Sequence, residues 1–196
     1  MKNIGLTGSI GSGKTMVCSV FEHIGIPVFN ADIQAKECYN DKLFLKEIAD
    51  EFGKSIVVDN VLDRNALANI VFNNKDRLIK LNSMVHPKVL DRFFLWRNYQ
   101  SAPYVILESA ILFEIGWEKK FESIICINSP KEVSIQRAMS RDNVRREIVE
   151  ERMNNQLSIE EKVEKSDFIV FHDNKTMLLP QILEIHNRII ESSKGN

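Results

Sequence analysis

The chain has 196 residues, of which 44% are hydrophobic and 27% are charged, a composition that excludes disorder as its main state and favours one globular domain. Its 26 lysines and arginines are matched by 27 acidic residues, and the net charge of −1 argues against a protein held to nucleic acid by bulk charge.

Short apolar runs typical of buried strands recur along the chain and are separated by helical patterns. The strands are expected at residues 4–6, 27–29, 104–107, 124–127 and 168–171. Helices are expected at residues 14–24, at a heavily charged stretch over 133–157 and at 177–190. Strands that alternate with helices indicate an α/β architecture with a parallel five-stranded sheet.

The middle of the chain interrupts this alternation. Residues 41–100 carry helical patterns and no convincing strand alternation. An apolar stripe that includes Val85 is expected to end at His86 and Pro87, because proline fits the first turn of a new helix. We therefore predict a helical insertion after the second strand, within one domain.

Four of the eight glycines lie in the first thirteen residues, where residues 8–15 read GSIGSGKT. This string matches the phosphate-loop pattern G-x-x-x-x-G-K-[ST], and it follows an apolar strand and opens an amphipathic helix. In such a loop the backbone N–H groups surround a phosphate, glycine permits the close approach, and the helix N-terminus adds its positive dipole. We therefore predict that residues 8–15, the phosphate loop, bind a nucleotide.

The lysine and threonine of this motif have separate expected roles. Lys14 is expected to reach the β- and γ-phosphates of ATP, and the Thr15 hydroxyl to ligate Mg²⁺. The residues expected to contact the nucleotide are Gly8, Gly11, Ser12, Gly13, Lys14, Thr15 and Met16.

Two acids follow predicted strands at the same carboxyl edge of the sheet. Asp32 comes just after the second strand and could accept a proton from an attacking hydroxyl, the alternative being that Asn30 or Asp32 caps a helix. Glu108 ends the third strand and is expected to hold Mg²⁺ through water, the alternative being a solvated strand end.

Basic residues form two further groups of candidates. Arg137 and Arg141 are four residues apart on one helix face, and we expect them to neutralise charge on a transferring phosphoryl group. Their neighbours 145–146 lie among acids, which favours a solvated face with salt bridges. In the helical insertion, Arg64 and Lys88 are candidate anion contacts, and His86 is either structural or faces the cleft.

The phosphate loop alone leaves the reaction open. GTPases usually carry N-K-x-D for guanine, whereas residues 74–77 read NKDR, with the acid one place early. A short chain with a helical insertion and an arginine-rich late helix favours a kinase that encloses a small acceptor. Three scattered cysteines in no C-x-x-C pair, with no signal-peptide core, predict a cytoplasmic protein without a disulfide framework or a zinc site.

Taken in order, the motifs resemble those of the dephospho-CoA kinases from residue 4 to about residue 190. The resemblance is carried by residues 6–14, Ala31-Asp32, Arg64 with Leu67, His86-Pro87, Leu112-Phe113-Glu114, Arg137 with Arg141-Asp142, and Arg152-Met153 with Gln156. It implies that ATP with Mg²⁺ phosphorylates the 3′-hydroxyl of dephospho-CoA in the last step of coenzyme A synthesis. The implied fold is a P-loop NTPase core at 1–36, 101–136 and 166–196, an acceptor-binding insert at about 37–100 and a lid over ATP at about 137–165.

The resemblance also implies that Asp32 is the acid beside the acceptor hydroxyl and that the insert, with Arg64, His86 and Lys88, binds the acceptor. The chain departs from the family pattern in several places. Asn30 replaces a usual Asp, Glu108 stands where Asp is common, Ala110 replaces a common proline, and residues 171–174 differ from a usual Asn-containing turn.

Two other functions stay open at this point. One is a kinase of a nucleoside or another small metabolite on the same scaffold, and the other is a nucleotide-dependent regulatory protein with no acceptor. The expected partner is a small-molecule substrate, with no nucleic acid and no membrane, in a monomer or weak homo-oligomer.

Overall fold

The computed structural model describes residues 1–72 and 74–192, and the chain divides into two compact units. The core unit comprises Met1–Phe29 and Gln100–Asn196, and the helical unit comprises Asn30–Tyr99. The helical unit is thus inserted into the chain of the core unit, between the second strand and the third strand of the main sheet.

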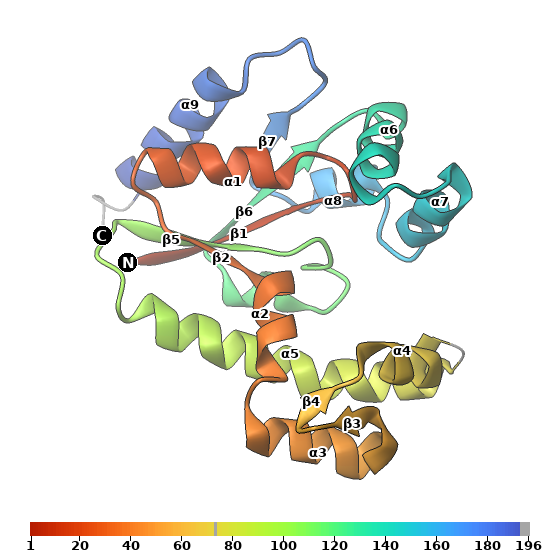
Figure 1. Ribbon diagram of the computed structural model, residues 1–196. Helices are drawn as coiled ribbons and strands as arrows, with labels where there is room; N and C mark the ends of the chain where they lie inside the picture. The colour runs from red at the N-terminus through yellow and green to blue at the C-terminus, as the bar shows by residue number, and fades with distance from the viewer. Residues whose placement is uncertain (73, 193–196) are drawn as a thin grey trace. The chain divides into compact units, whose positions relative to one another are not determined.

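A five-stranded parallel sheet organises the core unit (Figure 1). Its order is β2-β5-β1-β6-β7, with β1 at Lys2–Gly8, β2 at Val28–Asn30, β5 at Tyr104–Glu108, β6 at Ser123–Asn128 and β7 at Phe168–Phe171. In the central register, Leu6 pairs with Glu108 on one side and with Ile125 on the other. All five predicted strands are confirmed, and the carboxyl ends of β1, β5 and β6 lie at one edge of the sheet.

Helices cover the two faces of this sheet (Figure 1). The helices of the core unit are α1 at Lys14–His23, α6 at Lys131–Asp142, α7 at Arg146–Asn154, α8 at Ile159–Glu164 and α9 at Leu178–Glu191, with a short 3-10 helix, η2, at Trp117–Lys120. Helices α1 and α9 contact each other, and their apolar residues join Ile4, Leu6, Ile125 and Ile127 in one cluster. Because successive strand residues alternate between faces, Cys126 points the opposite way, where α8 packs against β1 and β6.

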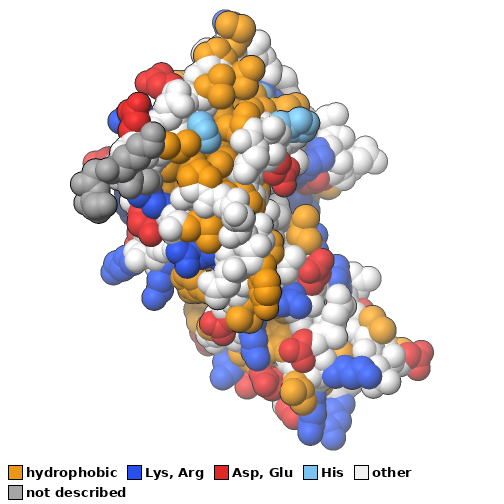
Figure 2. Space-filling model, turned by 90° about the vertical axis from the view of Figure 1, so that its left-hand side faces the viewer, with side chains coloured by type: hydrophobic (Ala, Val, Ile, Leu, Met, Phe, Trp, Pro, Cys, Tyr) orange, Lys and Arg blue, Asp and Glu red, His pale blue; other side chains and the backbone are white. Residues whose placement is uncertain are grey.

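The surface over α9 is partly apolar. The helix buries Ile182, Ile185 and Ile189, whereas Leu179 and Leu183 are exposed at 52% and 39%. Figure 2 shows hydrophobic side chains reaching the surface in the upper part of the face that it presents. Such exposure is ordinary for a globular protein. In the described residues no helix is long and apolar enough to cross a membrane, and the three cysteines are buried and free.

The helical unit contains one long helix where the sequence predicted two. Its helices are α2 at Ala31–Cys38, α3 at Lys42–Phe52, α4 at Arg64–Phe72 and α5 at Lys75–Arg97, with a 3-10 helix, η1, at Lys54–Ile56. The expected interruption at His86 and Pro87 is wrong, because α5 runs through Pro87. Its buried residues follow each other at intervals of four on both sides of the proline, and this packing outweighs the loss of one backbone donor; they are Leu81, Val85, Val89 and Phe93.

A small hairpin in the helical unit was not predicted. Strands β3 at Val57–Val58 and β4 at Val61–Leu62 pair antiparallel across Asp59 and Asn60, both with positive φ. Asp and Asn tolerate the left-handed conformation that such a two-residue turn requires. The signal was present in these two residues, but two-residue strands are too short to show alternation.

The charged stretch after β6 also differs from its prediction as one helix over 133–157. Asn143 adopts a left-handed conformation (φ 51°) and ends α6, so a second helix, α7, begins at Arg146. The short helix α8 begins after Ser158, whose side chain forms a capping box with Glu161. The helical stretch is therefore built from separate pieces joined by a segment at residues 155–158, which becomes important at the site.

Candidate active site

The phosphate loop connects β1 to α1 at the carboxyl edge of the sheet. Helix α1 begins at Lys14, and its N-cap is Gly13, which has φ 94° and provides no side-chain cap. An uncapped helix N-terminus presents its N–H groups to an anion. Thr15 and Met16 lie in the exposed first turn of α1. The local geometry is therefore that of a phosphate-binding turn.

Two glycines of the loop are enclosed by protein on the outside. A Cβ on Gly11 would lie 2.0 Å from the Ser134 carbonyl oxygen, and one on Gly13 would lie 2.1 Å from His172 Nδ1. Both glycines also have positive φ, at 75° and 94°. Glycine is thus required for packing against α6 and the segment after β7, in addition to the approach of a phosphate that the sequence suggested.

Lys14 lies folded onto its own loop. Its Nζ is 3.1 Å from the Gly8 carbonyl oxygen, 3.2 Å from that of Ser9 and 3.9 Å from Glu108 Oε1. Glu108 is only 5% exposed, because β5 lies beside β1 and ends next to the loop. The alternative of a solvated strand end is therefore wrong for Glu108, which instead provides a buried carboxylate beside the lysine.

Arg137 of α6 also lies against the loop. Its guanidinium donates to the Ser12 carbonyl oxygen at 3.3 Å and to Asn174 Oδ1. His172 Nδ1 lies 2.9 Å from the same Ser12 oxygen and 3.2 Å from the Arg137 guanidinium: protonated, it donates to the carbonyl, and unprotonated, it accepts from the arginine. Burial lowers the pKa of His172, which favours the neutral ring. Arg137 and His172 thus hold the loop next to Gly13.

Arg141 is placed differently from Arg137, although both lie on α6. Its guanidinium forms a two-point ion pair with Asp142, at 2.7 and 3.0 Å, and Asp142 also pairs with Arg152 at 3.1 Å. These interactions lower the pKa of Asp142, with the Arg141 hydrogen bond as the largest cause. Arg146 pairs with Glu132 and Glu150, as expected for a solvated, salt-bridged face.

The helical unit holds the other candidates. Asn30 Oδ1 accepts a hydrogen bond from the Ile33 N–H at 2.8 Å and caps α2, which leaves Asp32 exposed in the first helical turn. The N-cap of α2 is therefore Asn30 and not Asp32. The Asp32 carboxylate is accessible to a ligand.

Arg64 and Lys88 lie close to the C-terminal end of α2. The Arg64 guanidinium donates to the Lys36 carbonyl oxygen at 3.4 Å, and the Lys88 amine lies 5.5 Å from the centre of the Phe44 ring. His86 is partly buried, and burial lowers its pKa. Because α5 is continuous, His86 and Lys88 are two residues apart on one helix and point to different sides. They are not expected to contact the same group of an acceptor.

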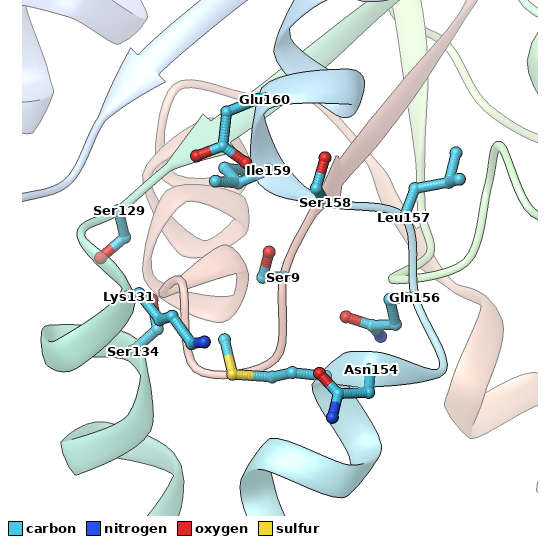
Figure 3. Close-up of a pocket in the computed structure, with 11 residues that line it drawn as sticks. Ser9, Ser129, Lys131, Ser134, Asn154, Gln156, Leu157, Ser158, Ile159 and Glu160 are labelled. Carbon is cyan, nitrogen blue, oxygen red and sulfur yellow. The ribbon is translucent and has the colours of Figure 1, made fainter.

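A pocket of about 310 Å³ lies beside the phosphate loop (Figure 3). Ser9 of the loop, Lys131 and Ser134 of α6, and the segment with Gln156 line it. The Gln156 side chain accepts a hydrogen bond from the Ile10 N–H at 3.2 Å. The sequence did not single out His172, Ser134 or Gln156 as contacts of the loop, because each is more than one hundred residues away.

The protein groups suited to a metal ion are few. Among residues 1–72 and 74–192 there is no cluster of three or more His, Cys, Asp or Glu side chains that could hold one. A phosphate loop does not need such a cluster, because Mg²⁺ keeps several waters and binds mainly to substrate phosphates. Thr15, which follows Lys14 in the chain, and the buried Glu108 carboxylate, 3.9 Å from Lys14 Nζ, fit this mode.

Comparison with known proteins agrees with this geometry. A family model described as dephospho-CoA kinase matches residues 2–178. The chain belongs to the dephospho-CoA kinase family. It is similar to the dephospho-CoA kinases of Bacteroides fragilis, with 34% identity over 93% of this chain and 90% of that protein, and of Fusobacterium nucleatum, with 37% identity over 85% and 87%. The crystal structure of TT1252 from Thermus thermophilus has a TM-score of 0.84 at 32% identity and covers 97% of both chains. Family membership therefore extends over both units and the phosphate loop.

Proposed function

We propose that this chain transfers the γ-phosphoryl group of ATP to the ribose 3′-hydroxyl of dephospho-CoA, giving coenzyme A and ADP in the last step of coenzyme A biosynthesis. Family membership over residues 2–178 and the geometry of the phosphate loop carry the proposal. The 3′-oxygen forms a bond to the γ-phosphorus, the bond from that phosphorus to the ADP oxygen breaks, and the hydroxyl proton leaves to a base.

The nucleotide side of the reaction rests on the phosphate loop. Lys14 exchanges its contacts with the Gly8 and Ser9 carbonyls for oxygens of the β- and γ-phosphates. Glu108, 3.9 Å away, keeps the amine at this edge of the sheet. Thr15 and, through water, Glu108 would hold Mg²⁺, which when bound would neutralise charge that develops on the phosphates. The N-terminus of α1 supplies backbone donors that need no rearrangement.

The acceptor side rests on the helical unit. Asp32 accepts the proton of the 3′-hydroxyl, and its exposed position in the first turn of α2 and its independence from the helix cap support that role. Arg64, His86 and Lys88 are proposed contacts of the acceptor, with Arg64 and Lys88 at one end of α2 and His86 on another side of α5. The acceptor carries a pyrophosphate, and the two cationic side chains suit it.

The lid arginines are proposed to neutralise the transferring group. Arg137 already contacts the phosphate loop, and Arg141 leaves its exposed pair with Asp142 at small cost, because a surface ion pair contributes only about 0–1 kcal/mol. In phosphoryl transfer, positioning and electrostatic stabilisation supply most of the catalysis. An enclosed site also keeps water from taking the phosphoryl group.

The experiment that tests this function is ADP release measured with ATP and Mg²⁺, with and without dephospho-CoA. ADP formation should depend on dephospho-CoA. Two control compounds should give little ADP: adenosine, which is only part of the acceptor, and coenzyme A, whose 3′-oxygen is already phosphorylated. Equal rates with adenosine would favour a general nucleoside kinase. ATP binding without transfer to any acceptor would favour a regulatory protein, and either result would overturn the proposal.

We further propose that the enzyme acts in the cytoplasm as a monomer or weak homo-oligomer, with no nucleic-acid or membrane partner. The scattered reduced cysteines and the balanced charge of the chain support this setting. Sedimentation of the purified chain at micromolar concentration, with and without ATP, tests the oligomeric state; a tight dimer would contradict it.

A further inference from the structure

The phosphate loop is contacted by a segment that lies far from it in the sequence and to which no role in the reaction has been given above. This segment, residues 156–158, follows α7 and precedes α8, and we refer to it as the strap. Its first residue, Gln156, accepts a hydrogen bond through Oε1 from the Ile10 N–H at 3.2 Å. Figure 3 shows Gln156, Leu157 and Ser158 along one side of the pocket, with Ser9 of the loop at its centre. The strap thus connects the segment between α7 and α8 directly to the phosphate loop.

The strap is itself anchored to the interior of the core unit. The Leu157 N–H donates to Glu114 Oε1 at 2.8 Å, and Lys162 Nζ lies 2.9 Å from the same oxygen. Lys162 also donates to the Ala110 carbonyl oxygen at 2.6 Å and is fully buried. Ser158 caps α8 immediately afterwards. Both sides of Leu157 are therefore fixed, and Gln156 has little freedom to move away from Ile10.

A buried ion pair is an unusual choice for simple stability. Removing two charges from water costs about as much as their attraction returns, and an apolar pair of similar size is often as stable. An apolar side chain in place of Glu114 cannot accept the hydrogen bond of the Leu157 N–H. The Glu114–Lys162 pair therefore fixes the position of the strap, which an apolar pair would leave undetermined.

We propose that Gln156 is a positioning residue for phosphoryl transfer: it holds the Ile10 peptide, and through it the phosphate loop, in the orientation that binds the nucleotide phosphates, while Glu114 and Lys162 hold Gln156 in place. The proposal rests on the proposed function for its catalytic consequence but not for its effect on nucleotide binding. Gln156 itself lies outside the phosphate loop. Its proposed contribution is to fix the orientation of the Ile10 N–H and, with it, the backbone conformation of the loop residues after Ile10.

The first test replaces Gln156 with Met, which keeps the length of the side chain and removes the acceptor. ADP affinity should fall about tenfold, the range expected for one lost hydrogen bond, and kcat should fall by a similar factor. The KM for dephospho-CoA should stay close to that of the parent chain, and the thermal midpoint should fall by only about 2–4 °C, the shift that one lost hydrogen bond causes in a chain of this size. Asn154→Met is the matched control, because Asn154 lines the same pocket two residues away; it should leave ADP affinity unchanged.

Hydrogen exchange at the Ile10 amide provides a readout that stability alone would not move. Exchange should accelerate in Gln156→Met relative to the parent chain, whereas Gln156→Glu keeps an acceptor oxygen and should retain protection of the amide. Unchanged exchange and unchanged ADP affinity in Gln156→Met would overturn the proposal. So would a loss of affinity that only follows a fall in the thermal midpoint. A chain that binds ADP as expected but does not phosphorylate dephospho-CoA would refute the proposed function alone.

The second test isolates the anchor without leaving a buried charge. Lys162→Met with Glu114→Gln removes both charges and keeps an acceptor for the Leu157 N–H. Lys162→Met with Glu114→Met removes the acceptor as well. The first double variant should keep ADP affinity within about threefold, and the second should resemble Gln156→Met. Equal ADP affinity in the two folded double variants would show that Glu114 does not act through the strap, and would overturn that part of the proposal.

Discussion

The candidate residues of the core unit and those of the helical unit differ in how the fold presents them. In the core unit, the proposed phosphate site consists of backbone geometry, of Gly11 and Gly13 packed against distant residues, and of Lys14 beside the buried Glu108 carboxylate. In the helical unit, the candidates are side chains on helix surfaces, with Asp32 exposed and Arg64 near the end of α2. A site made of backbone tolerates little change, whereas a site made of surface side chains can be altered one residue at a time.

The largest effect is expected at Lys14. Lys14→Ala removes the charge that neutralises the β- and γ-phosphates, and kcat should fall by about 10⁴-fold. The fold should persist, because the loop is shaped by its glycines and by contacts from α6 and residue 172. Steady-state kinetics and far-ultraviolet circular dichroism check the two parts. Activity within tenfold of the parent chain would contradict the assignment.

A smaller but still large loss is expected at Asp32. Asp32→Asn should lower kcat by about 10²–10³-fold with little change in KM, because the carboxylate acts on the proton in the transition state. Asn30→Ala is the matched variant two residues earlier: it removes the cap of α2, so it should cost about 1 kcal/mol of stability and leave kcat nearly unchanged. If Asp32→Asn changes only KM, Asp32 binds the acceptor and is not the base.

Substitutions of Arg141 and Arg146 test whether the core unit also uses exposed side chains in catalysis. Arg141→Ala should lower kcat by about tenfold to a hundredfold if Arg141 leaves Asp142 for the phosphoryl group. Arg146→Ala, which removes a guanidinium paired with Glu132 and Glu150, should have almost no effect. Matching rates for the two variants would return Arg141 to the salt-bridged surface.

The last prediction concerns stability and compares two glycine-to-alanine substitutions, one that changes backbone conformation alone and one that also disturbs packing. Gly25 has φ 86° and open space around it, whereas Gly11 has φ 75° and meets the Ser134 carbonyl. Gly25→Ala should lower the free energy of unfolding by about 1 kcal/mol from conformation alone. Gly11→Ala should lower it by about 1–3 kcal/mol more, because the loop and α6 must separate. Urea unfolding measures both, and equal midpoints would show that the contact with Ser134 relaxes freely.

Local patterns predicted the local parts of this molecule well. The five strands, the phosphate loop and helix α1 each depend on residues that are neighbours in the sequence, and the structure confirms them. Pro87 was misjudged because the packing of both halves of α5 outweighs one lost donor. Asn143 ends α6 by a backbone conformation that no periodicity reveals.

The contacts around the phosphate loop could not be predicted in the same way. Ser134, Gln156 and His172 meet the loop through the tertiary fold, and no spacing in the sequence relates them to residues 8–15. Gln156 was visible only as part of a family resemblance, without a partner. The roles of Asp32, Arg64, His86, Lys88 and the lid arginines remain predictions.

The contacts of the phosphate loop also determine whether a fragment that contains the motif would contain the complete loop environment. Eight consecutive residues contain the whole pattern, yet the groups that enclose it are 146 residues away at Gln156 and 160 residues away at His172. A fragment that stopped before β7 would contain every letter of the motif and would lack the imidazole that lies over Gly13. The eight-residue motif thus corresponds to a phosphate loop whose surroundings come from nearly the full length of the chain.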